Sequence, residues 1–310
     1  MAVALVACGP PSADRPPPGS FAFGVFGDGP YYLWEEGPFE RLIEDVNGTD
    51  LAWFVHVGDV LGRSCADDVM QKRFAQLNTI RHPVIYTPGN NEWTDCHEGG
   101  SGGFDPLDRL ASLRRIFFAT PGRSIGGGTM RVESQAEDST FAEFPENVRW
   151  VVGGFVFATV HVVGSSNGME SFPGRRTELD AEVVRRTDAA ARWIDAAFAT
   201  AYAMSAKGVV IALHADLGMD PGAPRQGYSR FVQQLKRYVA EFAGPVLLIH
   251  GDSHEYRVDR PLRDEHDTPY PNFTRLETFG SPDIGWVRVV VDTVAGRFVQ
   301  FEPRLMRGWW

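Results

Sequence analysis

The sequence has no surplus of positive charge, no long apolar run and few cysteines, and each absence narrows the possible functions. Its 30 Lys and Arg against 40 Asp and Glu give a formal net charge of −10. This charge argues against binding to a nucleic-acid backbone, because there is no basic surplus to displace counterions. No apolar run approaches the roughly 20 residues that a membrane-spanning helix needs. With three cysteines, at most one intramolecular disulfide can form.

The composition and the order of the predicted helices and strands are typical of a globular α/β protein. Hydrophobic residues make up 43% of the 310 residues, enough for a large core. Neither an internal repeat nor an interior linker divides the chain, so we expect one domain over residues 21–310. Helix-like and strand-like segments alternate, and the C-terminal part is rich in strands, which predicts two packed sheets with helices outside. Strands are expected at 51–57, 84–86, 150–163 (one or two), 209–213 and 246–249, and helices at 39–46, 67–79, 107–118, 179–203 and 228–242.

The first 20 residues resemble a targeting segment and are not expected to join the fold. Met1–Ala7 are apolar, Leu5-Val6-Ala7-Cys8 matches a bacterial lipobox, and a Pro-rich stretch follows. This predicts a lipid anchor through Cys8 and an extracytoplasmic lipoprotein, either periplasmic or at the cell surface. The apolar segment is short and lacks a preceding basic region, which a start codon assigned too late explains. The alternative is a chance apolar start before a linker, in a cytoplasmic protein.

Five turns with acidic, amide or imidazole side chains each follow an apolar, strand-like run. The runs are FAFGVFGDG, WFVHVGD, VIYTPGNNE, VVIALHAD and VLLIHGDSH. In open α/β sheets the carboxyl ends of the strands meet at one edge, where sites form. Oxygen and imidazole ligands gathered there suit hard or borderline divalent metals, so we predict a two-metal site. The side chains concerned are those of Asp28, Asp59, Asn90, His214, Asp252 and His254.

Two of the cysteines are expected in loops at the same sheet edge as the predicted ligands. If Cys8 is lipidated, Cys65 and Cys96 remain as a pair. Each follows a ligand-bearing turn, so neighbouring strands would bring them within the ~5–6 Å between Cα atoms that a disulfide needs. We predict this disulfide, in an oxidising compartment. The alternative is two free thiols in a cytosolic protein.

The order GD, GD, GN-x-E, H and GD-x-H, spread over residues 21–302, resembles the calcineurin-like metallophosphoesterase superfamily. The strings GDGPYY, TPGNNEWTDCHE, HVVGSSNG and LETFGSPDIGW resemble a poorly characterised bacterial subgroup of it. The resemblance implies a four-layer α/β/β/α sandwich of two mixed sheets flanked by helices. It also implies two divalent cations (Mn, Fe, Zn or Mg) and hydrolysis of a small-molecule phosphomonoester or phosphodiester by an activated hydroxide.

The resemblance also implies a role for each predicted ligand. Asp28 and His254 would bind the first metal, and Asp59 would bridge both. Asn90 and His214 would bind the second metal. Asp252 stands where the family usually has a histidine and would add an oxygen ligand to the second metal.

Two positions depart from the family pattern. Pro30 replaces the histidine of the first motif and cannot coordinate through its side chain. Asn91 replaces the histidine that helps to protonate the leaving group, and an amide cannot act as an acid. The expected catalytic set is therefore Asp59, Asn91 and, as a replacement acid, His97. The other candidate replacements are His56 and His161.

Each of these residues also has a purely structural interpretation, so other functions remain open. An Asp after a strand is often a helix cap or turn residue, and a His at a strand end is often a hydrogen-bonded core residue. By strand alternation His250 is expected to be structural. The alternatives to a phosphoesterase are a weakly active or non-catalytic exported binding protein with the same fold, or an exported hydrolase of another substrate. The sequence leaves the substrate, the metal and the oligomeric state open.

Overall fold

The computed structural model describes residues 15–220, 222–223 and 226–306. Cys8 and the lipobox lie outside these residues, so the lipid anchor stays a prediction. The described strands form two sheets. One is five-stranded with the order β12-β11-β1-β2-β3, and the other is seven-stranded with the order β4-β5-β6-β7-β8-β10-β9. Strands from both ends of the chain share the five-stranded sheet, because β1 pairs with β11.

The helices lie on the outer faces of the two sheets, and none of those described is both long and apolar enough to cross a membrane. The five-stranded sheet contains β1 (Ser20–Phe26), β2 (Phe54–His56), β3 (Val84–Tyr86), β11 (Gly285–Asp292) and β12 (Arg297–Leu305). The seven-stranded sheet contains β4 (Glu133–Ser134), β5 (Val148–Val152), β6 (Phe155–Thr159), β7 (Gly208–Ala212), β8 (Val246–His250), β9 (Arg257–Asp259) and β10 (Phe273–Glu277). The α-helices are α1 (Glu36–Gly48), α2 (Asp67–Leu77), α3 (Pro106–Phe117), α4 (Gly164–Gly168), α5 (Thr177–Ala203) and α6 (Ser229–Glu241). The 3₁₀ turns are η1 (Leu33–Glu35), η2 (Thr94–His97), η3 (Gly99–Ser101) and η4 (Gln135–Glu137).

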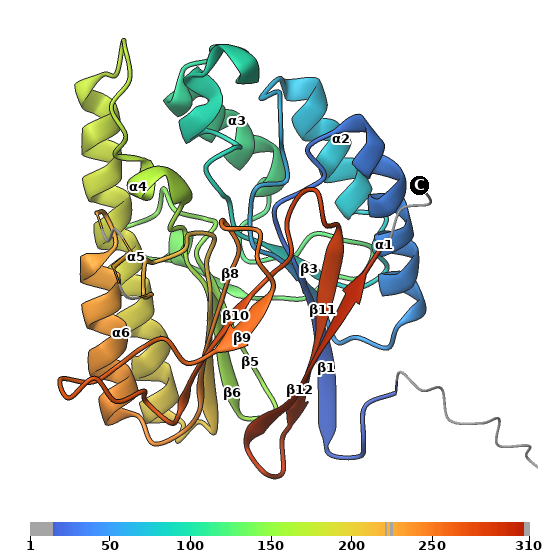
Figure 1. The fold of residues 1–310 in the computed structure, drawn as a ribbon, viewed down its shortest axis with the longest axis vertical. Coiled ribbons are helices and arrows are strands. Elements are labelled where there is room, and N and C mark those ends of the chain that lie inside the picture. The colour runs from blue at the N-terminus through green and yellow to red at the C-terminus, as the bar shows by residue number, and fades with distance from the viewer. Residues whose placement is uncertain (1–14, 221, 224–225, 307–310) are drawn as a thin grey trace, which may run out of the picture.

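Figure 1 shows helices outside two packed sheets, which makes four layers. Three of the hydrophobic cores formed by the described residues lie between these layers. The apolar faces of α5 and α6 cover one side of the seven-stranded sheet, with Phe198 and Leu235 among the buried side chains. The helices α1, α2 and α3 cover the five-stranded sheet, where Phe39 packs in the core. Between the sheets, Trp53 and Phe157 lie edge to face with ring centroids 5.0 Å apart. The α/β/β/α sandwich predicted from the sequence is confirmed.

The strands that precede the predicted ligands are parallel. β1, β2 and β3 pair in parallel in one sheet, and β6, β7, β8 and β10 do so in the other. β2, β3, β7 and β8 are buried along their whole length, as expected of parallel strands covered on both faces. Their carboxyl ends therefore deliver the following loops to one edge of the sandwich.

Some predicted elements differ from the structure in their limits. The strand expected at 51–57 is shorter, because only Phe54–His56 pair with both neighbours, and Gly58 then turns the chain with a φ of 99°. The run 150–163 is divided into β5 and β6 by a turn at Gly153 and Gly154, both with positive φ. The segment 164–168 that follows is one helical turn with left-handed dihedral angles at its centre.

Cys65 and Cys96 form the predicted disulfide, with their Cα atoms 5.8 Å apart. Cys65 lies in the loop after β2, and Cys96 lies in η2 after β3. The bond ties together the loops that carry Asp59 and Asn90. Further support comes from the Cys65 backbone N–H, which donates to the Ser101 carbonyl oxygen at 3.0 Å.

We predict that replacing both cysteines by serine lowers the free energy of unfolding by about 3–4 kcal/mol, because the disulfide closes a loop with a sequence separation of 31. Urea denaturation of the oxidised protein and of the double variant measures this difference. Adding a reductant should destabilise the parent to a similar extent and leave the double variant unchanged. Equal stability of the two proteins under oxidising conditions would contradict the prediction.

Candidate metal centre

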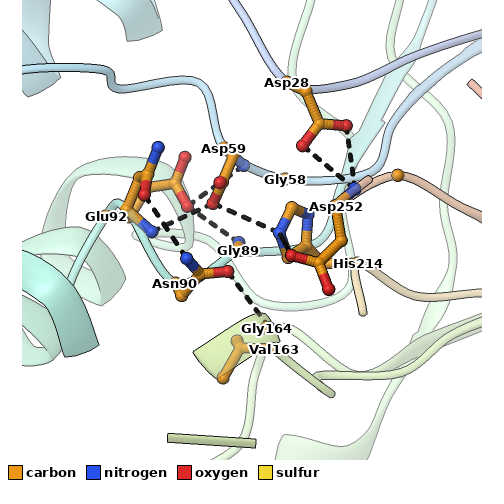
Figure 2. Close-up of polar contacts among 12 residues, drawn as sticks. Asp28, Gly58, Asp59, Gly89, Asn90, Glu92, Val163, Gly164, His214 and Asp252 are labelled. Atoms are coloured by element: carbon orange, nitrogen blue, oxygen red, sulfur yellow. Dashed lines mark hydrogen bonds and ion pairs between the residues drawn. The ribbon is translucent and has the colours of Figure 1, made fainter. Parts of the chain in front are cut away.

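The predicted ligands converge at the shared carboxyl edge of the strands, and Figure 2 shows most of them pointing toward one another. Asp28 follows β1, Asp59 follows β2, and His214 follows β7. One ligand atom from each of these three buried residues lies within 4.8 Å of the other two. Segments almost 190 residues apart in the sequence (28 to 214) thus meet in one cluster.

His214 has the geometry of a metal ligand. Its Nδ1 donates a hydrogen bond to the Val57 carbonyl oxygen at 2.9 Å, so in the neutral ring the lone pair lies on Nε2. That Nε2 lies 3.4 Å from Asp59 Oδ1 and 3.7 Å from Asp252 Oδ1. It is fully buried and has no hydrogen-bond partner among the described residues. A buried imidazole lone pair facing two carboxylates is the arrangement that a divalent cation satisfies.

Asp28 and His254 form the other side of the cluster. The Asp28 carboxylate accepts the backbone N–H of Asp252 at 3.1 Å. Asp28 Oδ1 also lies 3.6 Å from His254 Nε2. His254 Nδ1 donates to the Ser281 carbonyl oxygen at 2.7 Å, which again leaves the lone pair of Nε2 facing the cluster. A backbone carbonyl therefore holds each histidine ring with its Nε2 toward the cluster.

Asn90 is oriented by partners on both sides of its amide. Its Nδ2 donates to Asp95 Oδ2 at 2.8 Å, and its Oδ1 accepts the backbone N–H of Gly164 at 3.1 Å. Asp95 Oδ2 also accepts the Ser165 hydroxyl at 2.8 Å. A Cβ atom on Gly164 would lie 2.3 Å from Asn90 Oδ1 and 2.5 Å from Asp252 Oδ1. Only glycine therefore fits beside these two predicted ligands of the second metal.

The buried carboxylate of Glu92 holds two of the ligand loops together. It accepts the backbone N–H groups of Gly89 at 2.8 Å and of Asp59 at 3.2 Å, as well as that of Val60. A further contact from the Leu61 N–H is 3.3 Å long. Figure 2 shows Glu92 beside Asp59, on the side away from Asp28. It therefore acts as a support for the loops rather than as a ligand.

The cluster concentrates negative charge where water is excluded. Burial raises the pKa of Asp28 well above its ordinary value, and the charges of Asp59 and Asp252 add to this rise. Burial and the charge of Glu92 likewise raise the pKa of Asp59. Burial alone would lower the pKa of His214, but Asp28 and Asp252 outweigh it and raise the pKa. A bound cation would relieve this repulsion, so the residues present fit a divalent metal.

Four of the predicted ligands have backbone conformations that are rare outside glycine. Asp28, Asp59, Asp252 and His254 have φ values of 57°, 54°, 78° and 64°. Such residues each cost on the order of 1–3 kcal/mol and persist where the surrounding structure imposes them, often at functional sites. Here the strain turns each side chain back toward the cluster immediately after its strand.

The strain continues in α4, which borders Asn90. Ser165, Ser166 and Asn167 have φ values of 51°, 55° and 58°, which makes one left-handed turn. The fully buried guanidinium of Arg186 fixes it by donating to the Asn167 carbonyl oxygen at 2.9 Å and to the Asn167 side chain. The Tyr228 hydroxyl accepts the Asn167 N–H at 3.0 Å and donates to the carbonyl of the residue before α4 at 3.0 Å.

Of the predicted catalytic residues, Asn91 lies next to the cluster and His97 contacts other residues. The Asn91 backbone N–H donates to Asp59 Oδ1 at 2.9 Å. His97 Nδ1 binds the Thr94 carbonyl oxygen at 2.8 Å, and its ring stacks on Phe172 at 3.6 Å. In the described part of the chain, His97 makes no contact with the six predicted ligands.

The side chains of His56, His161 and His250 are buried and serve the surrounding structure. Nδ1 of His56 accepts the Gly58 backbone N–H at 3.2 Å, and burial lowers the pKa of His56 to about 3. His161 Nδ1 contacts the buried Glu146 at 2.8 Å. His250 faces the buried Glu277, 3.9 Å from its Nε2. In the ranges that the structure describes, none of these three side chains has a hydrogen bond or ion pair with the side chain of a predicted ligand.

Sequence reasoning assigned no role to Glu92, Asp95 or Gly164. Glu92 belongs to the GN-x-E string. A carboxylate three residues after Gly89 can accept the Gly89 backbone N–H, as in a capping box, so the spacing could have indicated this contact. No local pattern indicates the contacts of Asp95 and Gly164. Both bind the side chain of Asn90, and Gly164 lies 74 residues from it in the sequence.

Comparison with known proteins gives one family and several distant structures. The profile of the calcineurin-like phosphoesterase family matches residues 31–180. A protein of Thermus thermophilus is 11% identical with a TM-score of 0.49, over 93% of this chain and 99% of that one. A hypothetical protein of the same organism is 11% identical with a TM-score of 0.45, over 92% and 98%. A 5'-nucleotidase of Candida albicans is 12% identical with a TM-score of 0.41, over 86% of this chain and 46% of its own. No curated protein sequence matches.

We expect Gly164→Ala to weaken metal binding by about 10–100-fold, because its methyl group must displace Asn90 and Asp252. Calorimetric titration with Mn²⁺ and elemental analysis of the purified protein measure this. Gly99→Ala is the matched control, since an added Cβ there has no atom within 4 Å. If both variants bind Mn²⁺ like the parent, then the close approach of Gly164 has no bearing on the centre.

We expect Ser166→Gly to raise the free energy of unfolding by about 1 kcal/mol, because it relieves one left-handed residue of α4. Ser166→Ala removes the same hydroxyl but keeps the Cβ atom, so it should give no gain. Thermal or urea denaturation of the three proteins separates the two effects. An equal gain in both variants would show that the hydroxyl, rather than the backbone, is the source of strain.

Proposed function

We propose that this chain, whose residues 31–180 match the calcineurin-like phosphoesterase family, hydrolyses a phosphomonoester or phosphodiester bond with the help of two divalent cations. The observation that carries the proposal is the buried, unpartnered Nε2 of His214, which faces Asp59 and Asp252. Such an atom is unfavourable without a cation or a donor. The proposed catalytic domain is residues 21–310, and the proposed substrate is a small-molecule phosphoester.

We assign Asp28, Asp59 and His254 to the first cation. Asp59, Asn90, His214 and Asp252 would hold the second. Bound divalent cations would supply Lewis acidity, which acidifies water and offsets the charge of a phosphoryl group. The contacts of Asp59 support a bridging role, because its two carboxylate oxygens have different partners. Oδ1 faces His214 and Oδ2 faces the Tyr31 hydroxyl at 3.2 Å.

The protein's own groups would fix the geometry of the reaction. Glu92 holds the backbone of the Asp59 loop, and Asp95 with Gly164 holds the amide of Asn90. Neutral amide and imidazole ligands add no negative charge, which keeps the cluster able to attract an anionic phosphate. Preorganised groups of this kind need not reorganise during the reaction, which is a main source of catalysis.

A second candidate is a binding protein of the same fold with weak or no catalysis. The observation in its favour is that no histidine beyond His214 and His254 contacts the predicted ligands in the described residues. Asn91 takes the place of the family's proton donor and has no acidic proton. A protein with bound metal and no turnover would fit this candidate.

We also propose an extracytoplasmic location with a lipid anchor through Cys8. The disulfide between Cys65 and Cys96 supports an oxidising compartment. Cell fractionation of the wild type and of Cys8→Ser would test it, because only the wild type should remain with the membrane fraction.

We expect the protein loaded with Mn²⁺, Zn²⁺ or Fe to hydrolyse an aryl phosphate or an aryl phosphodiester, and a chelator to abolish the activity. Asp59→Asn should lower kcat by at least about a hundredfold and reduce the metal content, because the proposed bridging charge is lost. Steady-state kinetics with elemental analysis measure both effects.

The control is Asp50→Asn, the same change at an exposed residue, which should leave kcat and metal content unchanged. If the parent holds metal but turns over no phosphoester in a broad panel, the binding-protein candidate replaces the hydrolase.

A further inference from the structure

Tyr31 places its hydroxyl inside the metal centre. It directly follows Pro30, the residue that stands where the family pattern has a histidine ligand. The hydroxyl lies 3.2 Å from Asp59 Oδ2 and 3.4 Å from His254 Nε2. The tyrosine ring lies edge to face against the His254 ring, with centroids 5.5 Å apart. The side chain therefore points at the space that Asp28, Asp59 and His254 enclose.

The loop that carries Tyr31 is fixed by buried polar contacts. The backbone N–H groups of Tyr31 and Tyr32 donate to Glu35 Oε2 at 2.6 and 3.2 Å. The other oxygen of the buried Glu35 accepts the Ser281 hydroxyl at 2.5 Å. Across the loop, a Cβ atom on Gly62 would lie 2.3 Å from the Cα of Tyr31. The position of Tyr31 is thus imposed by three separate segments of the chain.

Both acceptors near the hydroxyl are atoms that we assign to the cations. The Asp59 carboxylate is the proposed bridge, and the lone pair of His254 Nε2 faces Asp28. Cations held by these atoms would compete with the hydroxyl for the same lone pairs, and the single lone pair of His254 Nε2 could not serve both. A donor left without an acceptor in a partly enclosed site is unfavourable, and a new acceptor that arrives there is favoured.

We propose that the Tyr31 hydroxyl is a catalytic residue that donates a hydrogen bond to a non-bridging oxygen of the phosphoryl group being transferred. This inference rests on the proposed phosphoesterase function and adds a substrate contact to it. The phenol keeps its proton throughout, and no bond to Tyr31 forms or breaks. The hydroxyl lies against Asp59 and His254, beside the atoms that a substrate at the cations would approach. The contact supplies a neutral donor to the phosphoryl group in a centre where Asn91 has no acidic proton.

The test compares Tyr31→Phe with Tyr32→Phe in the metal-loaded protein. Tyr32 is the neighbouring residue, and its ring stacks on Trp34 at 4.2 Å. Elemental analysis gives the metal content, calorimetry gives the affinity for orthovanadate and inorganic phosphate, and kinetics with an aryl phosphate give kcat and KM. We expect Tyr31→Phe to keep its metal, to bind orthovanadate at least tenfold more weakly and to lose about a hundredfold in kcat/KM. Tyr32→Phe should match the parent in all three.

Two results would overturn the inference. Loss of a cation from Tyr31→Phe would make the hydroxyl a metal ligand instead of a substrate donor. Unchanged orthovanadate affinity together with unchanged kcat/KM would make the ring merely structural. The binding measurement separates this inference from the function itself. If the parent binds orthovanadate but hydrolyses nothing, the phosphoesterase proposal fails, and the affinity of Tyr31→Phe still shows whether Tyr31 contacts the anion.

Discussion

The hydrogen bonds from backbone N–H groups to the Glu92 carboxylate are the interaction on which the metal centre depends. One buried side chain takes N–H groups from the turn after β2 and from the turn after β3. These turns have no regular secondary structure of their own, and their unpaired N–H groups would otherwise be buried without a partner. Because Asp59 and Asn90 lie in these turns, their relative position follows from Glu92. The disulfide between Cys65 and Cys96 adds a covalent tie farther along the same two loops.

The glycines of the GD and GN strings are explained by close approach between neighbouring loops. A Cβ on Gly89 would lie 2.0 Å from Asp59 Oδ1, and a Cβ on Gly251 would lie 2.0 Å from Asp28 Oδ2. Each glycine thus leaves room for the carboxylate of a neighbouring loop, which is why Gly precedes a predicted ligand at several strand ends. The motif encodes packing between loops as much as it encodes the ligands themselves.

The sequence predicted the layers and the convergence of the ligands because both follow from local patterns. Runs such as VLLIH are apolar throughout, which indicates strands buried on both faces, and parallel strands bring their carboxyl ends to one edge. Asp28, Asp59 and His214 could be placed together on this basis alone. The spacing of Cys65 and Cys96 relative to the same strands predicted their pairing.

The parts that could not be predicted depend on contacts between distant residues. Nothing near Gly164 indicates that its N–H binds Asn90, and nothing near Tyr31 indicates that its hydroxyl reaches Asp59 and His254. The left-handed turn at Ser165–Asn167 contradicts local propensity, and Arg186, from the middle of α5, is needed to fix it. His97 shows the converse, that closeness in sequence does not ensure contact. It is close to the predicted ligands in sequence, but its ring stacks on Phe172.

Charge and strain at this edge make the folded state depend on what binds there. Asp28 and Asp59 have raised pKa values, mainly through burial, so the folded protein holds protons that the unfolded chain releases near pH 4. Below that pH both states are protonated and these groups do not oppose folding. As pH rises toward neutrality, the unfolded chain ionises freely, while the folded chain must keep the protons or accept mutual repulsion, so the stability that these groups contribute decreases. A divalent cation held by these carboxylates would replace the protons. Because its ligands meet only in the folded arrangement, it would stabilise that state in proportion to the logarithm of its concentration over Kd. The same carboxylates that oppose folding in the absence of metal therefore couple cation binding to the stability of the sandwich. The three hydrophobic cores must offset that opposition until the cation is bound.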